Sequence, residues 1–119
     1  MELKEELYTR LQILEDGGLI SDRVTACCKQ VIELILEEKP DVDGERFGMF
    51  VTHLAMAMQR VRTGQQENPI DSQVLETVKM DAAYPRAEAF SRKMFPVCGV
   101  EFPQTEQDFL KVHLCNLFT

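Results

Sequence analysis

The sequence repeats apolar residues at helical spacing, and the clearest case lies between Asp43 and Gly64. Apolar side chains recur there every three or four positions, which places them on one face of a helix. They are Phe47, Phe50, Val51, Leu54, Met58 and Val61. Asp43 suits the start of this helix and Gly64 its end. No segment alternates apolar and polar residues long enough to predict a strand, so we expect an all-α fold.

Two more helices are predicted before this one. The first carries four leucines at spacings of four and three and ends at Gly17-Gly18. These leucines are Leu3, Leu7, Leu11 and Leu14. The second begins after Ser21, a candidate N-cap, and stops before Pro40. Its predicted inner face consists of Val24, Cys28, Val31 and Ile35.

The C-terminal part is predicted to hold two or three shorter helices after a loop at residues 63–69, "TGQQENP". Asp71 or Ser72 can cap the first of them, and Pro85 suits the first turn of another that ends at Gly99. A last helix is predicted to start near residues 104–105, with Phe109, Leu110, Leu114 and Leu117 facing inward. The expected fold is a compact bundle of five to six helices.

Length and charge limit the function classes. The 119 residues suit a single domain, residues 1–119. The net charge of -7 is concentrated in residues 1–45, which hold twelve acids and five bases, and no basic run is present. Direct nucleic-acid binding is therefore not expected, because it depends largely on Lys and Arg neutralising phosphates. The polar start and the lack of a long apolar run predict a cytoplasmic protein without a membrane segment.

Motifs for catalysis or cofactor binding are not found. The four cysteines, Cys27, Cys28, Cys98 and Cys115, lack CxxC spacing and are expected to be reduced, mostly buried thiols. The sequence contains no GxSxG turn, glycine-rich phosphate loop or HExxH motif. We therefore expect no enzyme activity, no cofactor and no metal.

The only two histidines lie in similar positions on two predicted helices. His53 shares a stripe with Arg60 beside the apolar face of its helix, and His113 shares a stripe with Glu106 on the last helix. Both histidines should therefore lie at the edge of the core. Three roles are possible for such residues: packing, metal binding and phosphate acceptance. Periodicity alone favours packing, because a lone histidine at an apolar margin is most often a hydrogen-bonded structural residue.

Four segments of the sequence resemble the PTS regulation domain, a helical module of bacterial antiterminators and transcriptional activators controlled by the sugar phosphotransferase system. They are "RLQILEDGGLIS", "FVTHLAMAMQRVRTGQQENP", "AAYPRAEAFSRKM" and "GVEFPQTEQDFLKVHLCN", and they span nearly the whole chain. The most specific marks are His53 with Arg60 and the spacing of seven residues between Glu106 and His113.

The resemblance implies that His53 and His113 are phosphoacceptors, supported by Arg60 and Glu106. The implied donors are the phosphocarrier HPr or a sugar-specific enzyme IIB. The module is then expected to form a homodimer, to contact a separate regulator protein, and to modulate transcription or antitermination. The alternative is an interaction module that is not phosphorylated. Thr52 precedes His53 where many relatives have an acid, and 119 residues leave no room for a nucleic-acid-binding domain.

Overall fold

The chain folds into six helices in a computed structural model that describes residues 2–65 and 69–119. The helices are α1 (Leu3–Asp16), α2 (Asp22–Glu38), α3 (Gly44–Arg62), α4 (Ser72–Lys79), α5 (Tyr84–Val97) and α6 (Gln104–Phe118). No strand occurs in the described ranges. The expectation of an all-α fold with five to six helices is confirmed. The central residues of the predicted "TGQQENP" loop, 66–68, lie outside the described residues.

Local signals determine where the helices begin and end. The side chains of Ser21, Asp43 and Asp71 accept hydrogen bonds from backbone N–H groups in the first turns of α2, α3 and α4. Ser21 was predicted as an N-cap and Asp71 was one of two candidates, whereas Asp43 was predicted only as the start of its helix. Helices α1 and α3 are followed by Gly18 and Gly64, which have φ angles of 76° and 77°. Glycine suits this left-handed conformation because it has no Cβ atom to clash with the backbone.

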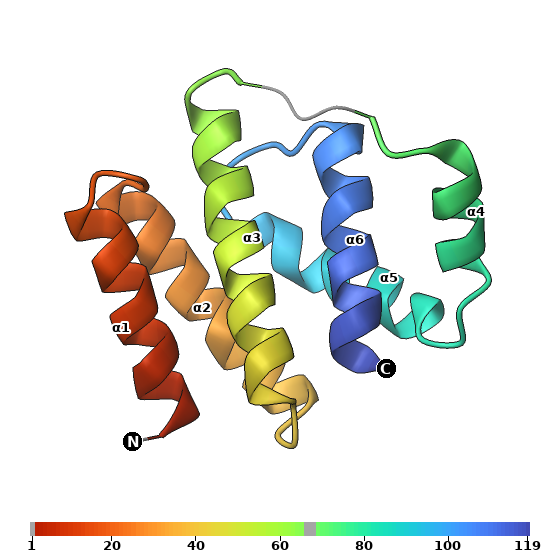
Figure 1. Ribbon diagram of the computed structural model, residues 1–119, viewed down its shortest axis with the longest axis horizontal. Helices are drawn as coiled ribbons and strands as arrows, with labels where there is room; N and C mark the ends of the chain where they lie inside the picture. The colour runs from red at the N-terminus through yellow and green to blue at the C-terminus, as the bar shows by residue number, and fades with distance from the viewer. Residues whose placement is uncertain (1, 66–68) are drawn as a thin grey trace.

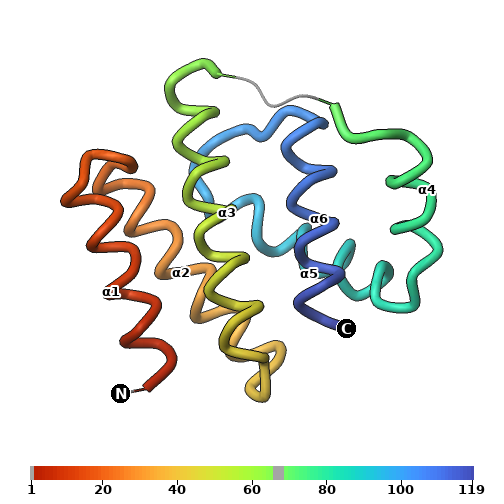
Figure 2. The backbone as a smooth tube through the Cα atoms, in the orientation of Figure 1, coloured from red at the N-terminus to blue at the C-terminus, as the bar shows by residue number. Residues whose placement is uncertain are grey.

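The first three helices pack against one another as a bundle, each antiparallel to the next along the chain, as Figure 1 shows at its left. Helix α6 runs antiparallel beside α3, and α4 lies at the outer edge against α6. Helix α5 lies behind them in this view and packs against α6 and α2. The tube in Figure 2 shows that α3 is central, with α2 on one side and α6 on the other. The pair α3 and α6 therefore joins segments that are far apart in the sequence.

One continuous core lies between these helices. The predicted inner faces of α2 and α3 are fully buried except for Val61 at the end of α3, which is partly buried. In α6, Leu110, Leu114 and Leu117 are buried as expected, whereas Phe109 is only half-buried. The prediction for Phe109 was wrong because helical spacing also places residues at the margin of a face, where they border a pocket.

The cysteine prediction is confirmed in the described chain. Cys28, Cys98 and Cys115 are buried free thiols, and Cys27 is partly buried. Burial raises the pKa of Cys98 to about 12 and that of Cys115 to about 11, so both remain protonated near neutral pH. No helix in the described residues has the length and apolar character needed to cross a membrane.

Candidate functional site: a stacked histidine pair

The two histidines meet across the seam between α3 and α6. Their rings are stacked, with centroids 4.0 Å apart and ring planes inclined by 11°. His53 is exposed on α3, whereas His113 is half-buried on α6. The predicted position at the edge of the core is therefore confirmed for both residues. The contact between the two rings was not predicted.

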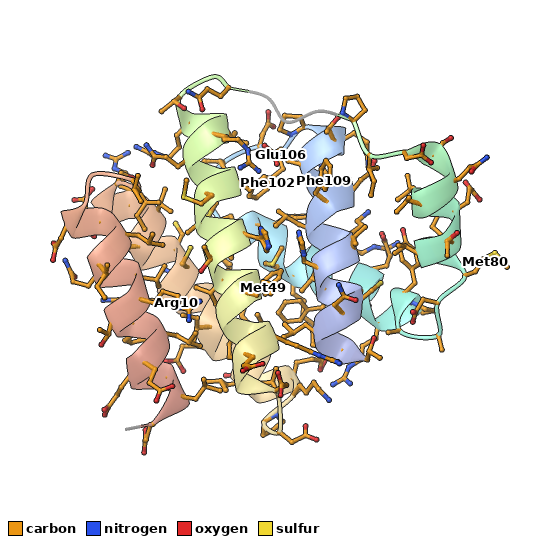
Figure 3. The ribbon with its side chains drawn as sticks, viewed as in Figure 1. Arg10, Met49, Met80, Phe102, Glu106 and Phe109 are labelled. Atoms are coloured by element: carbon orange, nitrogen blue, oxygen red, sulfur yellow. The ribbon has the colours of Figure 1, made fainter. Side chains whose placement is uncertain are left out.

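Arg60 and Glu106 meet on the same seam, two helical turns from the histidines. Nε of Arg60 donates to Oε2 of Glu106 at 3.0 Å, and Nη2 donates to Oε1 at 2.9 Å. This two-point geometry matches the planar guanidinium to the carboxylate. The Glu106 side chain is 2% exposed and that of Arg60 is 27% exposed. Figure 3 shows Glu106 between the two helices near the top of the seam.

The dipoles at the end of α3 and the start of α6 strengthen this ion pair. Glu106 lies in the first turn of α6, where the helix dipole favours a negative charge. Arg60 lies in the last turn of α3, where the dipole favours a positive charge. Since α3 and α6 are antiparallel, these two ends are neighbours in space. Both residues were expected to support the histidines, but their pairing was not predicted.

A pocket of about 180 Å³ joins the histidine pair to the ion pair. Its wall consists of His53, Ala57, Arg60, Glu106, Phe109, Leu110 and His113. All four site residues named from the sequence therefore line one pocket. Equal spacing is the signal that could have predicted this arrangement: His53 and Arg60 are seven residues apart on α3, and so are Glu106 and His113 on α6. Two antiparallel helices with matching spacing can bring both pairs together.

The environment keeps His113 neutral. Burial, followed by the charge of the adjacent His53, lowers the pKa of His113 from its ordinary value of 6.5 to about 4. The imidazole of His113 is therefore uncharged near neutral pH and retains a nitrogen lone pair. That is the form of histidine that can act as a nucleophile or accept a hydrogen bond.

A second pocket lies on the other side of His113 and was not predicted from the sequence. Its volume is about 280 Å³, and its wall consists of Arg46, Met49, Phe50, His113, Asn116 and Thr119. Arg46 donates from Nη1 to the backbone carbonyl of Asn116 at 3.2 Å, which links the start of α3 to the end of α6. Met49 is 60% exposed beside the histidine pair, as Figure 3 shows on the lower part of α3.

Thr52 makes its hydrogen bonds away from the histidine pair. Its hydroxyl donates to the carbonyl of Gly48 at 3.0 Å and accepts from Nη1 of Arg10 at 3.4 Å. The lack of a side chain at Gly48 lets the Arg10 guanidinium approach α3, since a Cβ atom there would lie 3.0 Å from Nη1. Thr52 therefore connects α3 to α1. In the described residues, no group of three or more His, Cys, Asp or Glu side chains is arranged to hold a metal ion.

Comparison with known proteins agrees with the resemblance. The family model for the PRD domain matches residues 29–117. The chain is also similar to the uncharacterized protein YhfY of Escherichia coli strain K12, with 24% identity over 113 residues that cover 94% of each protein. No solved structure matches the chain. The matched residues make up most of the chain and include both stacked histidines, Arg60 and Glu106. This protein therefore belongs to the PRD family of phosphotransferase-system regulatory domains.

Proposed function

We propose that this chain is a regulatory module that receives a phosphoryl group on the pair formed by His53 and His113 and changes its protein contacts as a result. The observation that carries the proposal is the stacked histidine pair beside Arg60 in one pocket. His53 is exposed and accessible to a donor protein, and His113 holds a neutral imidazole near neutral pH. The proposed donors are HPr and a sugar-specific enzyme IIB.

The transfer is a substitution at phosphorus. A ring nitrogen attacks the phosphoryl group of a donor phosphohistidine or phosphocysteine, and the donor P–N or P–S bond breaks as the new P–N bond forms. The acceptor ring loses its N–H proton to the departing donor atom or to water. The bond exchanged resembles the bond formed, so the reaction is reversible. The module carries a signal and does not turn over a metabolite.

The phosphoryl group is proposed to act through charge on the α3–α6 seam. It brings nearly two negative charges close to Arg60, whose present partner is the buried carboxylate of Glu106. A phosphoryl group that attracts the Arg60 guanidinium weakens an interaction that joins the two helices. The exposed side chain of Met49 and the pocket that contains Arg46 lie at the other end of the histidine pair. We propose that this surface contacts a second copy or a separate regulator protein.

The test is phosphorylation in a purified system. Phosphoenolpyruvate, enzyme I and HPr are incubated with the chain, with a matching enzyme IIB in a parallel reaction, and acid-labile phosphate on the chain is measured. The chain has only two histidines, so the His53→Ala, His113→Ala variant contains none. We expect label on the wild-type chain and none on this variant. Lys79→Ala, an exposed change on α4, is the matched control and should be labelled like the wild type.

The same samples distinguish signalling from simple binding. Sedimentation before and after phosphorylation should show a change in homodimer content or in the binding of a co-expressed regulator. Circular dichroism of the double variant checks that it keeps its helices. Absence of label with both donors would leave the alternative, an interaction module whose histidines only pack together.

A further inference from the structure

The two histidine rings are too close to be independent acceptors. Their centroids are 4.0 Å apart and their planes nearly parallel, so a group added to either ring lies within a few ångströms of the other. The rings also share the pocket that contains Arg60 and Glu106. Since Glu106 already neutralises Arg60, the pocket offers little spare positive charge for one phosphoryl dianion and less for two.

The neighbouring ring can supply the missing positive charge. The His53 charge already affects His113, since it contributes to the lowered pKa of that residue. A phosphoryl dianion on one ring has the opposite sign and favours protonation of the other. A protonated imidazole has no free nitrogen lone pair, so it cannot attack a second donor. The same proton makes it a counter-ion for the phosphoryl group.

We infer that His53 and His113 form one acceptor site that holds a single phosphoryl group, with the unmodified ring as its protonated counter-ion. This inference rests on the proposed function for its physiological donor, but it concerns the capacity of the site and can be tested without that donor. In the first step the donor P–N bond breaks, the ring P–N bond forms, and the ring N–H proton goes to the departing nitrogen. The second ring then takes a proton from water.

Other charged groups around the pair fit this assignment. Arg60 on α3 and Glu106 on α6 line the shared pocket, and Arg46 lies on the far side of His113. Glu88 of α5 pairs with Lys111 of α6 at 2.8 Å and also with Arg92 at 3.5 Å. Of the two arginines that line these pockets, Arg60 pairs with Glu106, and Arg46 donates to the uncharged Asn116 carbonyl on the side of His113 away from the shared pocket.

The experiment uses phosphoramidate, a small donor that needs no protein recognition. Intact mass at saturation should show one phosphoryl group on the wild-type chain, one on His53→Ala, one on His113→Ala, and none on the double variant. A wild-type chain that carries two phosphoryl groups would overturn the inference. A single variant that accepts none would also overturn it, because the wild-type limit would then reflect only one competent histidine.

A second measurement tests the counter-ion. Histidine ring NMR signals are titrated before and after phosphorylation, and the pKa of the unmodified ring should rise to about 7 or above, since a lower value would leave that ring uncharged near neutral pH. An unchanged or lowered pKa would refute the counter-ion role. Labelling by phosphoramidate but not by HPr or enzyme IIB would refute the proposed function and leave the inference intact. Two phosphoryl groups on the wild-type chain after incubation with HPr would support the proposed function and refute the inference.

Discussion

The Arg60–Glu106 pair joins a guanidinium to a carboxylate that is almost entirely buried. Removing one partner of such a pair leaves a charge without compensation in the protein interior. The partial exposure of Arg60 moderates this cost, since water can still reach the guanidinium. The pair therefore affects the free energy of unfolding mainly through the cost of removing one of its two partners.

We predict that Arg60→Met and Glu106→Gln each lower the free energy of unfolding by about 2 to 4 kcal/mol. The double variant Arg60→Met, Glu106→Leu should lose clearly less free energy of unfolding than the sum of the losses caused by Arg60→Met alone and Glu106→Leu alone. The reason is that the double variant leaves no unpaired charge. Urea unfolding measures these values. Arg92→Ala, which removes an exposed ion pair with Glu88, should change stability by about 0.5 kcal/mol or less. Equal costs for Arg60→Met and Arg92→Ala would contradict the prediction.

Among the elements, α4 differs from the other helices because none of its residues is buried. It packs against α6 at the edge of the molecule, and Met80 just beyond it is 86% exposed, as Figure 3 shows at the rim. Asp71 supports its first turn by accepting from the N–H groups of Gln73 and Val74. With so little buried surface, α4 should open locally without unfolding the core.

Asp71→Ala should therefore speed hydrogen exchange of the α4 amides by roughly fivefold, which corresponds to the loss of about 1 kcal/mol for an N-cap. The global free energy of unfolding should change little. Ser21→Ala is the matched comparison, because it removes the cap of α2, whose inner face is buried. That change should lower global stability by about 1 kcal/mol. If both variants had the same global effect, α4 would be part of the cooperative core.

For the whole molecule, stability should depend on pH through His113. Since its pKa is lowered from 6.5 to about 4, the unfolded chain binds more protons between these values. The free energy of unfolding should therefore decrease as the pH falls from 6.5 to 4, and this contribution should be complete above 6.5. The loss should be about 1 to 2 kcal/mol once solvent screening of a half-buried group is included.

The measurement compares urea unfolding of the wild type and His113→Gln across this pH range. Carboxylates titrate in both proteins, so the difference between the curves isolates the histidine. The free energy of unfolding of the wild type should fall relative to that of His113→Gln as the pH drops from 6.5, and this relative loss should level off below about 4. A constant difference throughout would show that His113 titrates alike in the folded and unfolded chains.

Much of this architecture was predictable because its signals are local. Ser21 caps α2 as expected, α3 begins beside Asp43 as expected, and the apolar face of α3 follows directly from spacing. The stacking of His53 on His113 was not predictable from periodicity, because it depends on which helices become neighbours. The resemblance to the PRD family singled out both histidines, but their contact and the Arg60–Glu106 bonds required the three-dimensional arrangement.

The pairing of α3 with α6 also has a kinetic consequence. Helices α1, α2 and α3 are consecutive and pack as neighbours, so their contacts close short loops and can form early. The contact of His53 with His113 instead closes a loop that contains α4 and α5, which costs more chain entropy. The histidine pair is then completed only after α6 has been synthesised and has docked. A partly made chain would display His53 without its neighbour, so the complete histidine pair is present only once α6 has docked.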